Sequence, residues 1–224
     1  MIKLEKGPEP QILTDHADEW LEELMEALAI GTKKADYLKS RYRHRDIKVA
    51  LIEETFAKCA YCESKILHTS FGDIEHVIPK SKDLKYSFMW KNLTLACDVC
   101  NTRKAEFDPS EDEVIDPYTT DPDEHLAFSG TMVFSKGTEL GKQTKTIMGL
   151  NRAELLERRK ERLESLVSII EDLLNPRLPV AARKAIFADF KSVELARSTP
   201  YSAMANAFAR QQEDLIDAVL DHRG

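Results

Sequence analysis

The sequence lacks any apolar run long enough to cross a membrane. Its most apolar stretches are short, such as LVSII at 166–170, which a serine interrupts, whereas a spanning helix needs about twenty consecutive apolar residues. The opening residues, MIKLEKGPEPQ, also lack the apolar centre of a secretion signal. We therefore expect no membrane contact and a cytoplasmic location.

Cysteine is scarce as well, with four residues in 224. They fall in two Cys-x-x-Cys pairs, Cys59 with Cys62 and Cys97 with Cys100. In a reducing compartment such pairs hold a metal more often than they form disulfides, and four thiolates complete the tetrahedral shell of a structural Zn²⁺. We expect a zinc ion that clamps the ends of the segment between the pairs. The alternative is four buried or redox-active thiols without metal.

An overall excess of basic residues is missing, since the formal net charge is −7, and binding to a nucleic-acid backbone draws on Lys and Arg. The average conceals two basic stretches. Residues 33–48 hold seven Lys or Arg against two acidic residues, with Tyr37 and Tyr42 among them, and residues 58–104 hold eight against five. We interpret the first stretch as a nucleic-acid contact. A solvated helix face is the alternative.

Apolar periodicity predicts a mostly helical chain. It indicates a helix over 14–28, a basic helix over 34–43, and a third that leads into the first cysteine pair. Residues 108–124 carry eight acidic residues and three prolines, which is typical of a connector, and LAFSGTMVFS at 126–135 predicts a short hairpin. A long helix is expected from Asn151 onward, followed after prolines by helices over 180–198 and 201–221.

Two stretches between the cysteine pairs carry the chemistry. DIEHVIP at 73–79 predicts a strand that ends before its proline, so that Glu75 and His76 diverge around one small space. In NLTLAC at 92–97 the leucines alternate, which predicts a second short strand. The second cysteine pair then begins a helix that presents Asn101 and Lys104.

This insert resembles the HNH endonuclease motif. Glu75 and His76 match its first element, Asn92 matches the middle Asn, and Asn101 stands in place of the last His. The flanking cysteine pairs match the zinc-stapled branch of that family, whose fold is a ββα-metal hairpin. The resemblance implies that His76 is the general base, that Glu75 and Asn101 bind a catalytic divalent metal, and that Asn92 braces the loop holding His76.

These roles suit phosphodiester hydrolysis, which needs a base of near-neutral pKa and a cation beside the scissile phosphate. Histidine supplies the base. The carboxylate of Glu75 and the amide oxygen of Asn101 are hard ligands, which favours Mg²⁺ or Mn²⁺ as the catalytic ion. The resemblance also implies that Asp73 is a possible auxiliary ligand and that Lys104 contacts phosphate.

Other stretches narrow the resemblance to the PtuB-type group of HNH nucleases, which belongs to Septu and some retron anti-phage defence systems. The similar stretches are MIKLEKGPEP at 1–10, KCAYCESK at 58–65, IDPYTTDPDEHLAF at 115–128 and LNRAELLERR at 150–159. This likeness implies a role in defence and a partner ATPase of the PtuA type, related to ABC and SMC ATPases. The amphipathic C-terminal helices are then a docking surface for the partner; closing a core of their own is the equal alternative.

The expected fold class is mainly α with a small ββα-metal (HNH) core, set between N-terminal helices and a C-terminal helical region. The expected parts are an N-terminal helical region with the basic stretch (1–55), the zinc-stapled nuclease core (56–108), an acidic connector with a short hairpin (109–150), and the C-terminal helices (151–224). We expect a metal-dependent endonuclease that acts on DNA, or else on RNA. Two alternatives are open: a non-catalytic zinc-ribbon module that binds nucleic acid, and a toxin nuclease that cleaves tRNA.

Overall fold

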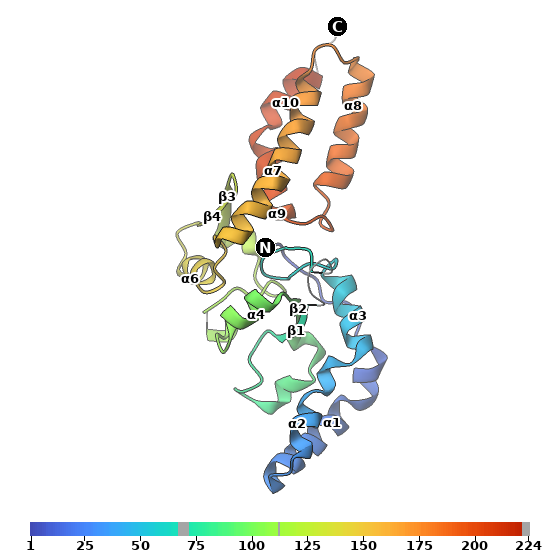
Figure 1. The fold of residues 1–224 in the computed structure, drawn as a ribbon, viewed down its shortest axis with the longest axis vertical. Coiled ribbons are helices and arrows are strands. Elements are labelled where there is room, and N and C mark those ends of the chain that lie inside the picture. The colour runs from blue at the N-terminus through green and yellow to red at the C-terminus, as the bar shows by residue number, and fades with distance from the viewer. Residues whose placement is uncertain (67–71, 112, 221–224) are drawn as a thin grey trace.

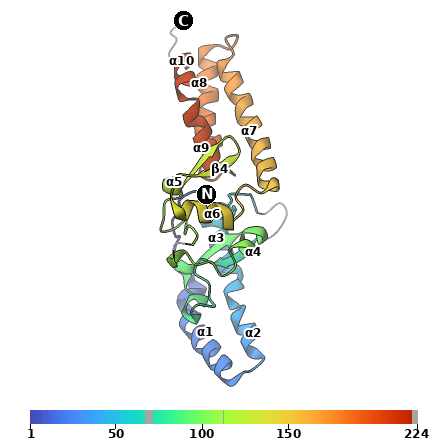
Figure 2. The same ribbon diagram turned by 90° about the vertical axis from the view of Figure 1, so that its left-hand side faces the viewer.

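The computed structural model describes residues 1–66, 72–111 and 113–220, and the molecule is elongated (Figures 1 and 2). Helices α1 (Gln11–Ile30) and α2 (Lys34–Lys39) form one end, and α7 (Ala153–Leu174), α8 (Val180–Asp189) and α10 (Glu213–Leu220) form the other. A small ββα unit lies between them. The expected fold class, mainly α with a small ββα core, is confirmed.

The N-terminal helices follow the predicted periodicity, with one break. Helix α1 buries Trp20 and Leu24 and ends at Gly31, whose φ of 72° closes the helix in the left-handed conformation that glycine tolerates best. The basic stretch was expected as one helix over 34–43, but α2 ends at Lys39 and a 3-10 turn, η1 (Arg41–Arg43), follows. Helix α3 (Arg45–Glu54) then leads to the first cysteine pair.

The central unit consists of β1 (Asp73–His76), β2 (Leu93–Ala96) and α4 (Asp98–Lys104). The strands pair antiparallel and α4 contacts β1. Gly72 precedes β1 with a φ of 63°, and a Cβ at this position would stand 2.5 Å from the Ile66 side chain. Only glycine therefore admits this close approach. Between the strands lie two 3-10 turns, η2 (Leu84–Ser87) and η3 (Trp90–Asn92).

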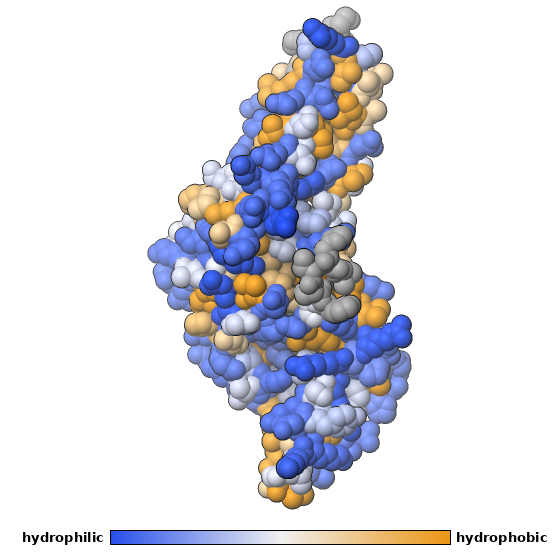
Figure 3. All heavy atoms as spheres, in the orientation of Figure 1, coloured by the Kyte–Doolittle hydropathy of each residue, from blue (hydrophilic) through white to orange (hydrophobic). Residues whose placement is uncertain are grey.

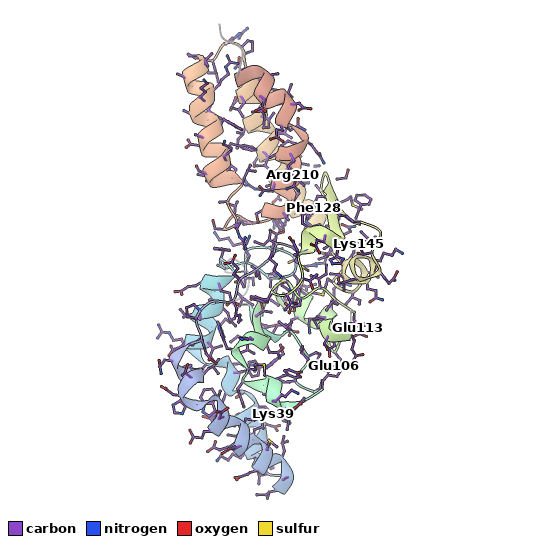
Figure 4. The ribbon with its side chains drawn as sticks, turned by 180° about the vertical axis from the view of Figure 1, so that it is seen from behind. Lys39, Glu106, Glu113, Phe128, Lys145 and Arg210 are labelled. Atoms are coloured by element: carbon purple, nitrogen blue, oxygen red, sulfur yellow. The ribbon has the colours of Figure 1, made fainter. Side chains whose placement is uncertain are left out.

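In its described residues, 108–111 and 113–124, the predicted connector has short helical turns, η4 (Pro109–Glu111) and the beginning of α5 (Pro122–His125), and no longer helix. The predicted hairpin is present as β3 (Leu126–Ser129) and β4 (Met132–Ser135), and α6 (Glu139–Ile147) follows it. Strand β3 contacts α9 (Ser202–Gln211), and Figure 4 shows Phe128 of the hairpin close to Arg210 of this helix. The hairpin thus joins the connector to the C-terminal helices.

The C-terminal region is more broken than the proline positions predicted. Helix α8 stops at Asp189 and passes into a π-helical turn, η5 (Phe190–Glu194), and the helix expected over 201–221 is divided at Gln212 into α9 and α10. These helices enclose a small core of their own. Its buried members are Leu166, Ile170, Leu173, Phe190, Ala205 and Ile216.

A second and larger core unites the other parts of the chain. It runs from the N-terminal helices through the cysteine pairs and both strands to the hairpin and the start of α7. Figure 3 shows apolar side chains at the surface over the C-terminal helices and over the end of α1, where Met25 and Ile30 are exposed. No helix within the described residues is long and apolar enough to span a membrane. The four-part division of the chain stays a prediction.

Candidate active site

The strand register sets the directions of the candidate site residues. Asp73 lies opposite Ala96, and His76 lies opposite Leu93. Because side chains alternate along a strand, Asp73 and Glu75 share one face of β1 while His76 belongs to the other. Glu75 and His76 therefore diverge, as the strand pattern predicted.

His76 is a buried imidazole with one nitrogen already engaged. The residue is 6% exposed, and Nε2 lies 3.0 Å from the carbonyl oxygen of Ser87. A carbonyl only accepts hydrogen bonds, so Nε2 carries the proton and Nδ1 carries the lone pair of the neutral ring. The edge of the ring packs against Tyr42, with 4.6 Å between centroids. Nδ1 is thus the atom that can take up a proton.

The surroundings keep this imidazole uncharged at neutral pH. Burial lowers the pKa of His76 to about 4; the bond to Ser87 opposes this shift, and the positive charges of Lys80 and Lys104 add to it. The neutral form is the one that acts as a base. The position therefore supplies the uncharged form of the base, although its pKa lies below the near-neutral value that the role favours.

Asn92 closes the loop that follows His76. Its Oδ1 accepts a hydrogen bond from the Ile78 amide at 2.7 Å, and its Nδ2 donates to the carbonyls of Ile78 and Tyr86 at 2.9 and 3.2 Å. The side chain is 4% exposed. Ser87, which holds the imidazole, directly follows this loop, so Asn92 fixes both ends of the segment that orients His76.

Asp73 and Asn101 lie side by side where α4 crosses β1. The amide Nδ2 of Asn101 donates to Asp73 Oδ2 at 3.0 Å, which leaves the amide oxygen as the atom available to a hard cation. Glu75 follows on the same strand face, 8% exposed. Within the described part of the chain, only the cysteines form a ready cluster of three or more His, Cys, Asp or Glu ligands. The oxygen donors are neighbours, but they are not assembled into such a cluster.

Lys104, for which the resemblance implies a phosphate contact, is buried beside Glu75 and His76. Its side chain is fully buried, and its ammonium contacts Glu75 Oε1 at 2.9 Å and the carbonyl oxygen of His76 at 3.0 Å. Burial raises the pKa of Glu75, and the adjacent Lys104 opposes this rise. Lys104 therefore faces Glu75 and His76 from inside the molecule, and its role in phosphate contact stays a prediction.

The four cysteine thiols converge, as their spacing predicted. Their sulfur atoms all lie within 4.8 Å of one another, and those of Cys62 and Cys97 are 3.8 Å apart. A tetrahedral zinc ion with bonds of about 2.3 Å places its sulfurs roughly 3.8 Å apart. The cluster therefore has the size and the donor atoms of a closed structural zinc site.

Arg152 supports the thiol cluster and was not identified from the sequence. It is the residue before α7, and its guanidinium nitrogens lie 3.7 Å from the sulfur of Cys100 and 3.9 Å from that of Cys97. Four thiolates around Zn²⁺ carry a net negative charge, which a guanidinium offsets. No local pattern could reveal this contact, because Arg152 lies far from the cysteine pairs along the chain.

A cavity of about 910 Å³ opens beside the thiols rather than beside His76. Cys97, Asp98 and Arg103 line it from the α4 side, and residues of α7 including Arg158 line the other wall. None of the residues that we expect to be catalytic belongs to its lining. The candidate catalytic residues therefore lie outside this cavity.

Comparisons with known proteins agree with the motif. Residues 59–107 match the family model described as HNH endonuclease. The chain is 30% identical over 194 residues to the Septu protein PtuB of Bacillus mycoides (strain KBAB4), which covers 71% of this chain and 66% of that protein. It is 32% identical over 112 residues to the Septu protein PtuB of Bacillus thuringiensis, covering 49% and 43%. The chain thus spans about two thirds of the first relative and less than half of the second.

Proposed function

We propose that this chain, which carries an HNH endonuclease domain at residues 59–107, is a metal-dependent endonuclease that hydrolyses phosphodiester bonds in nucleic acid. DNA is the first expected substrate and RNA the second. The observation that carries the proposal is the neutral, buried His76, whose Nε2–H bond to Ser87 leaves Nδ1 as a base, on the same short strand that carries Asp73 and Glu75.

His76 acts as the general base. Its Nδ1 takes the proton from the attacking water, and the Ser87 carbonyl stabilises the imidazolium that forms, because it accepts the Nε2–H bond throughout. Asn92 keeps Ser87 in place by closing the intervening loop. Lys104 is a positioning residue that joins the Glu75 carboxylate to the backbone of His76.

Oxygen donors hold the catalytic ion. Glu75 and Asn101, with Asp73 as an auxiliary ligand, offer the carboxylate and amide oxygens that Mg²⁺ or Mn²⁺ prefers. When bound, such an ion neutralises the charge that grows on the phosphate and on the leaving oxygen. The four thiolates hold Zn²⁺ at a separate position and shape the scaffold.

The likeness to PtuB proteins supports a role as the nuclease subunit of an anti-phage defence system. In this proposal the partner is an ATPase of the PtuA type, and the complex works in the cytoplasm. The chain's own C-terminal helices are a candidate docking surface. Their small core supports the alternative that they also fold on themselves.

One substitution tests both the nuclease activity and the role in phage defence. His76→Ala should reduce cleavage of DNA or RNA in Mg²⁺ or Mn²⁺ by about 10²-fold to 10⁴-fold, because it removes the base. Cleavage is measured on gels with zinc-loaded protein, alone and together with the ATPase. In cells that carry both genes, the same substitution should abolish protection against phage in plaque counts.

A matched control is His125→Ala, since His125 contacts Thr138 and lies in the connector rather than at the site. It should cleave at the parent rate. Cleavage that survives His76→Ala would refute the role of His76, and phage protection that survives it would refute the link between nuclease and defence.

A zinc-ribbon module that binds nucleic acid without cutting it is the second candidate. The pairing of Glu75 with Lys104 favours it, because an ammonium already compensates the carboxylate that should hold the metal. Under this reading no preparation cleaves nucleic acid in any divalent ion, and His76→Ala leaves nucleic-acid affinity unchanged.

A further inference from the structure

Two cations gather on the ring of Tyr42, directly beside the candidate base. The Lys80 ammonium lies 4.2 Å from the ring centroid, and the Arg43 guanidinium lies 5.5 Å from it. Arg43 also donates from Nε to the Tyr42 hydroxyl at 3.3 Å. The same ring packs against His76 at 4.6 Å. We call Tyr42, Arg43 and Lys80 the cation cluster.

The cluster joins segments that are distant in the sequence. Tyr42 and Arg43 belong to η1, between α2 and α3, while Lys80 lies in the loop that leaves β1. Figure 1 shows α3 beside the β1–β2 hairpin, and α3 contacts β2. The fold therefore carries the predicted basic stretch to the catalytic hairpin, and the positive charge of Lys80 already acts on His76 and Glu75.

Within residues 1–66, 72–111 and 113–220, neither Arg43 nor Lys80 forms an ion pair, although the charge of Lys80 also acts on Glu75. Some neighbouring cations are paired, among them Arg41 with Glu23 at 2.6 Å, Lys82 with Glu111 at 2.9 Å and Lys85 with Asp83 at 2.9 Å. A carboxylate would fix the position of a cation and also neutralise its charge. An aromatic ring fixes the position of the cation without neutralising it, so the positive charge can still attract an anion.

We propose that Arg43 and Lys80, held on Tyr42, bind a backbone phosphate of the nucleic acid adjacent to the scissile one. This inference rests on the proposed function, because it takes nucleic acid as the substrate. A guanidinium matches the oxygens of a phosphate with parallel N–H bonds, and an ammonium adds a point charge. Since the Tyr42 ring touches the imidazole as well, a phosphate bound here sets the strand against His76.

Salt dependence of binding tests the assignment without relying on cleavage. The probe is a short fluorescein-labelled DNA duplex, titrated with full-length zinc-loaded protein in the His76→Ala background with Ca²⁺ present. A plot of log affinity against log salt concentration has a negative slope. Each phosphate contact that is lost should reduce the magnitude of this slope by about 0.9. We expect this decrease for Arg43→Ala and for Lys80→Ala. Lys80→Arg, which keeps the charge, should retain the parent slope.

Lys82→Ala and Lys85→Ala are the matched controls, because these neighbours are exposed and already paired with carboxylates. Both should bind with the parent slope, and thermal melting should show that all variants fold. The proposal is overturned if Arg43→Ala and Lys80→Ala keep the parent slope, if the controls lower it equally, or if the parent does not bind the duplex.

The two proposals fail separately in this design. If the parent protein cleaves nucleic acid but the cluster variants keep the parent salt dependence of binding, the phosphate-binding role of the cation cluster is contradicted and the nuclease proposal stands. If the parent protein never cleaves nucleic acid but the cluster variants show a weaker salt dependence of binding, the nuclease proposal is contradicted and the phosphate-binding role of the cation cluster is supported.

Discussion

At the scale of a single residue, Lys104 shows that the group a side chain contacts determines its role. On α4, positions 101 and 104 lie one turn apart and face the same strand, so Asn101 reaches Asp73 and Lys104 reaches Glu75. Sequence spacing places both residues near β1. It does not reveal whether an ammonium there points to a phosphate or is enclosed with a carboxylate, because that depends on how closely the helix packs.

Replacing this lysine should chiefly cost stability. Lys104→Ala leaves the buried Glu75 without its counter-ion, and removing one member of a buried ion pair costs about 3–5 kcal/mol. The free energy of unfolding is measured by urea titration monitored by circular dichroism. Lys82→Ala, at an exposed pair, should leave it close to the parent value, because solvent screens such a pair. A variant at position 104 with parent stability and weakened DNA binding would instead favour phosphate contact.

The candidate site divides into residues that a local pattern can identify and residues that it cannot. The cysteines, His76 and Asn92 stand in short motifs, so the sequence indicates them directly. The positions of Tyr42 against His76 and of Arg152 against the thiols depend on how distant segments pack. A single sequence contains no signal for such contacts.

At the scale of elements, periodicity located the helices better than it located their ends. The predicted hairpin and the long helix after Asn151 are present, because alternation and apolar spacing are local properties. Helix α9 begins at Ser202, one residue after the predicted start, which a nearby proline marks in the sequence. The break at Gln212 between α9 and α10 was not predicted, because apolar spacing continues across it.

Zinc should hold the ββα unit together. Removing the metal with a strong chelator, or replacing the buried Cys100 by Ser, should abolish the hydrogen-exchange protection of β1, β2 and α4, because thiolate sites of this kind contribute about 10 kcal/mol or more to folding. Elemental analysis should find one Zn²⁺ per chain. Added Zn²⁺ should restore protection, whereas Mg²⁺ should not.

Ser64→Ala is the control for this experiment, because the Ser64 hydroxyl lies 3.3 Å from the Cys62 sulfur but is not one of the four thiol ligands. It should keep its zinc. Protection of the strands that persists after complete zinc removal would contradict a structural role for the metal.

At the scale of the whole molecule, one buried carboxylate connects three parts of the chain. Glu63 follows the first cysteine pair and is 2% exposed. Its Oε1 accepts from the amino group of Met1 at 2.6 Å, and its Oε2 lies 3.6 Å from the Lys58 ammonium and 2.8 Å from the Ser202 hydroxyl. Lys58 in turn donates to the carbonyls of Arg197 and Thr199. These bonds attach the C-terminal helices to the first cysteine pair.

Stability should depend on the charge of Glu63. Burial alone would raise the pKa of Glu63, but the amino terminus and Lys58 lower it to about 2, from an ordinary value of 4.5. A lowered pKa in the folded state stabilises the protein above pH 4.5, and this contribution is lost as the pH falls toward 2. At pH 7, Glu63→Gln should therefore lose about 3 kcal/mol of unfolding free energy.

Urea titrations of parent and variant at matched zinc content measure this difference. The difference in unfolding free energy between parent and variant should be largest at pH 7. It should begin to decrease below about pH 4.5 and decrease further toward pH 2. A gap of the same size at pH 7 and near pH 3 would assign the effect to packing rather than to charge.

The contact of Arg152 with the thiols limits how far the chain can be shortened. A fragment trimmed to 59–107 would lose that guanidinium, and also Lys6 and Gly7, whose backbone or side chain bonds Leu93 and Trp90. We therefore expect residues 59–107 to be less stable alone than within the whole chain, because these flanking contacts would be missing.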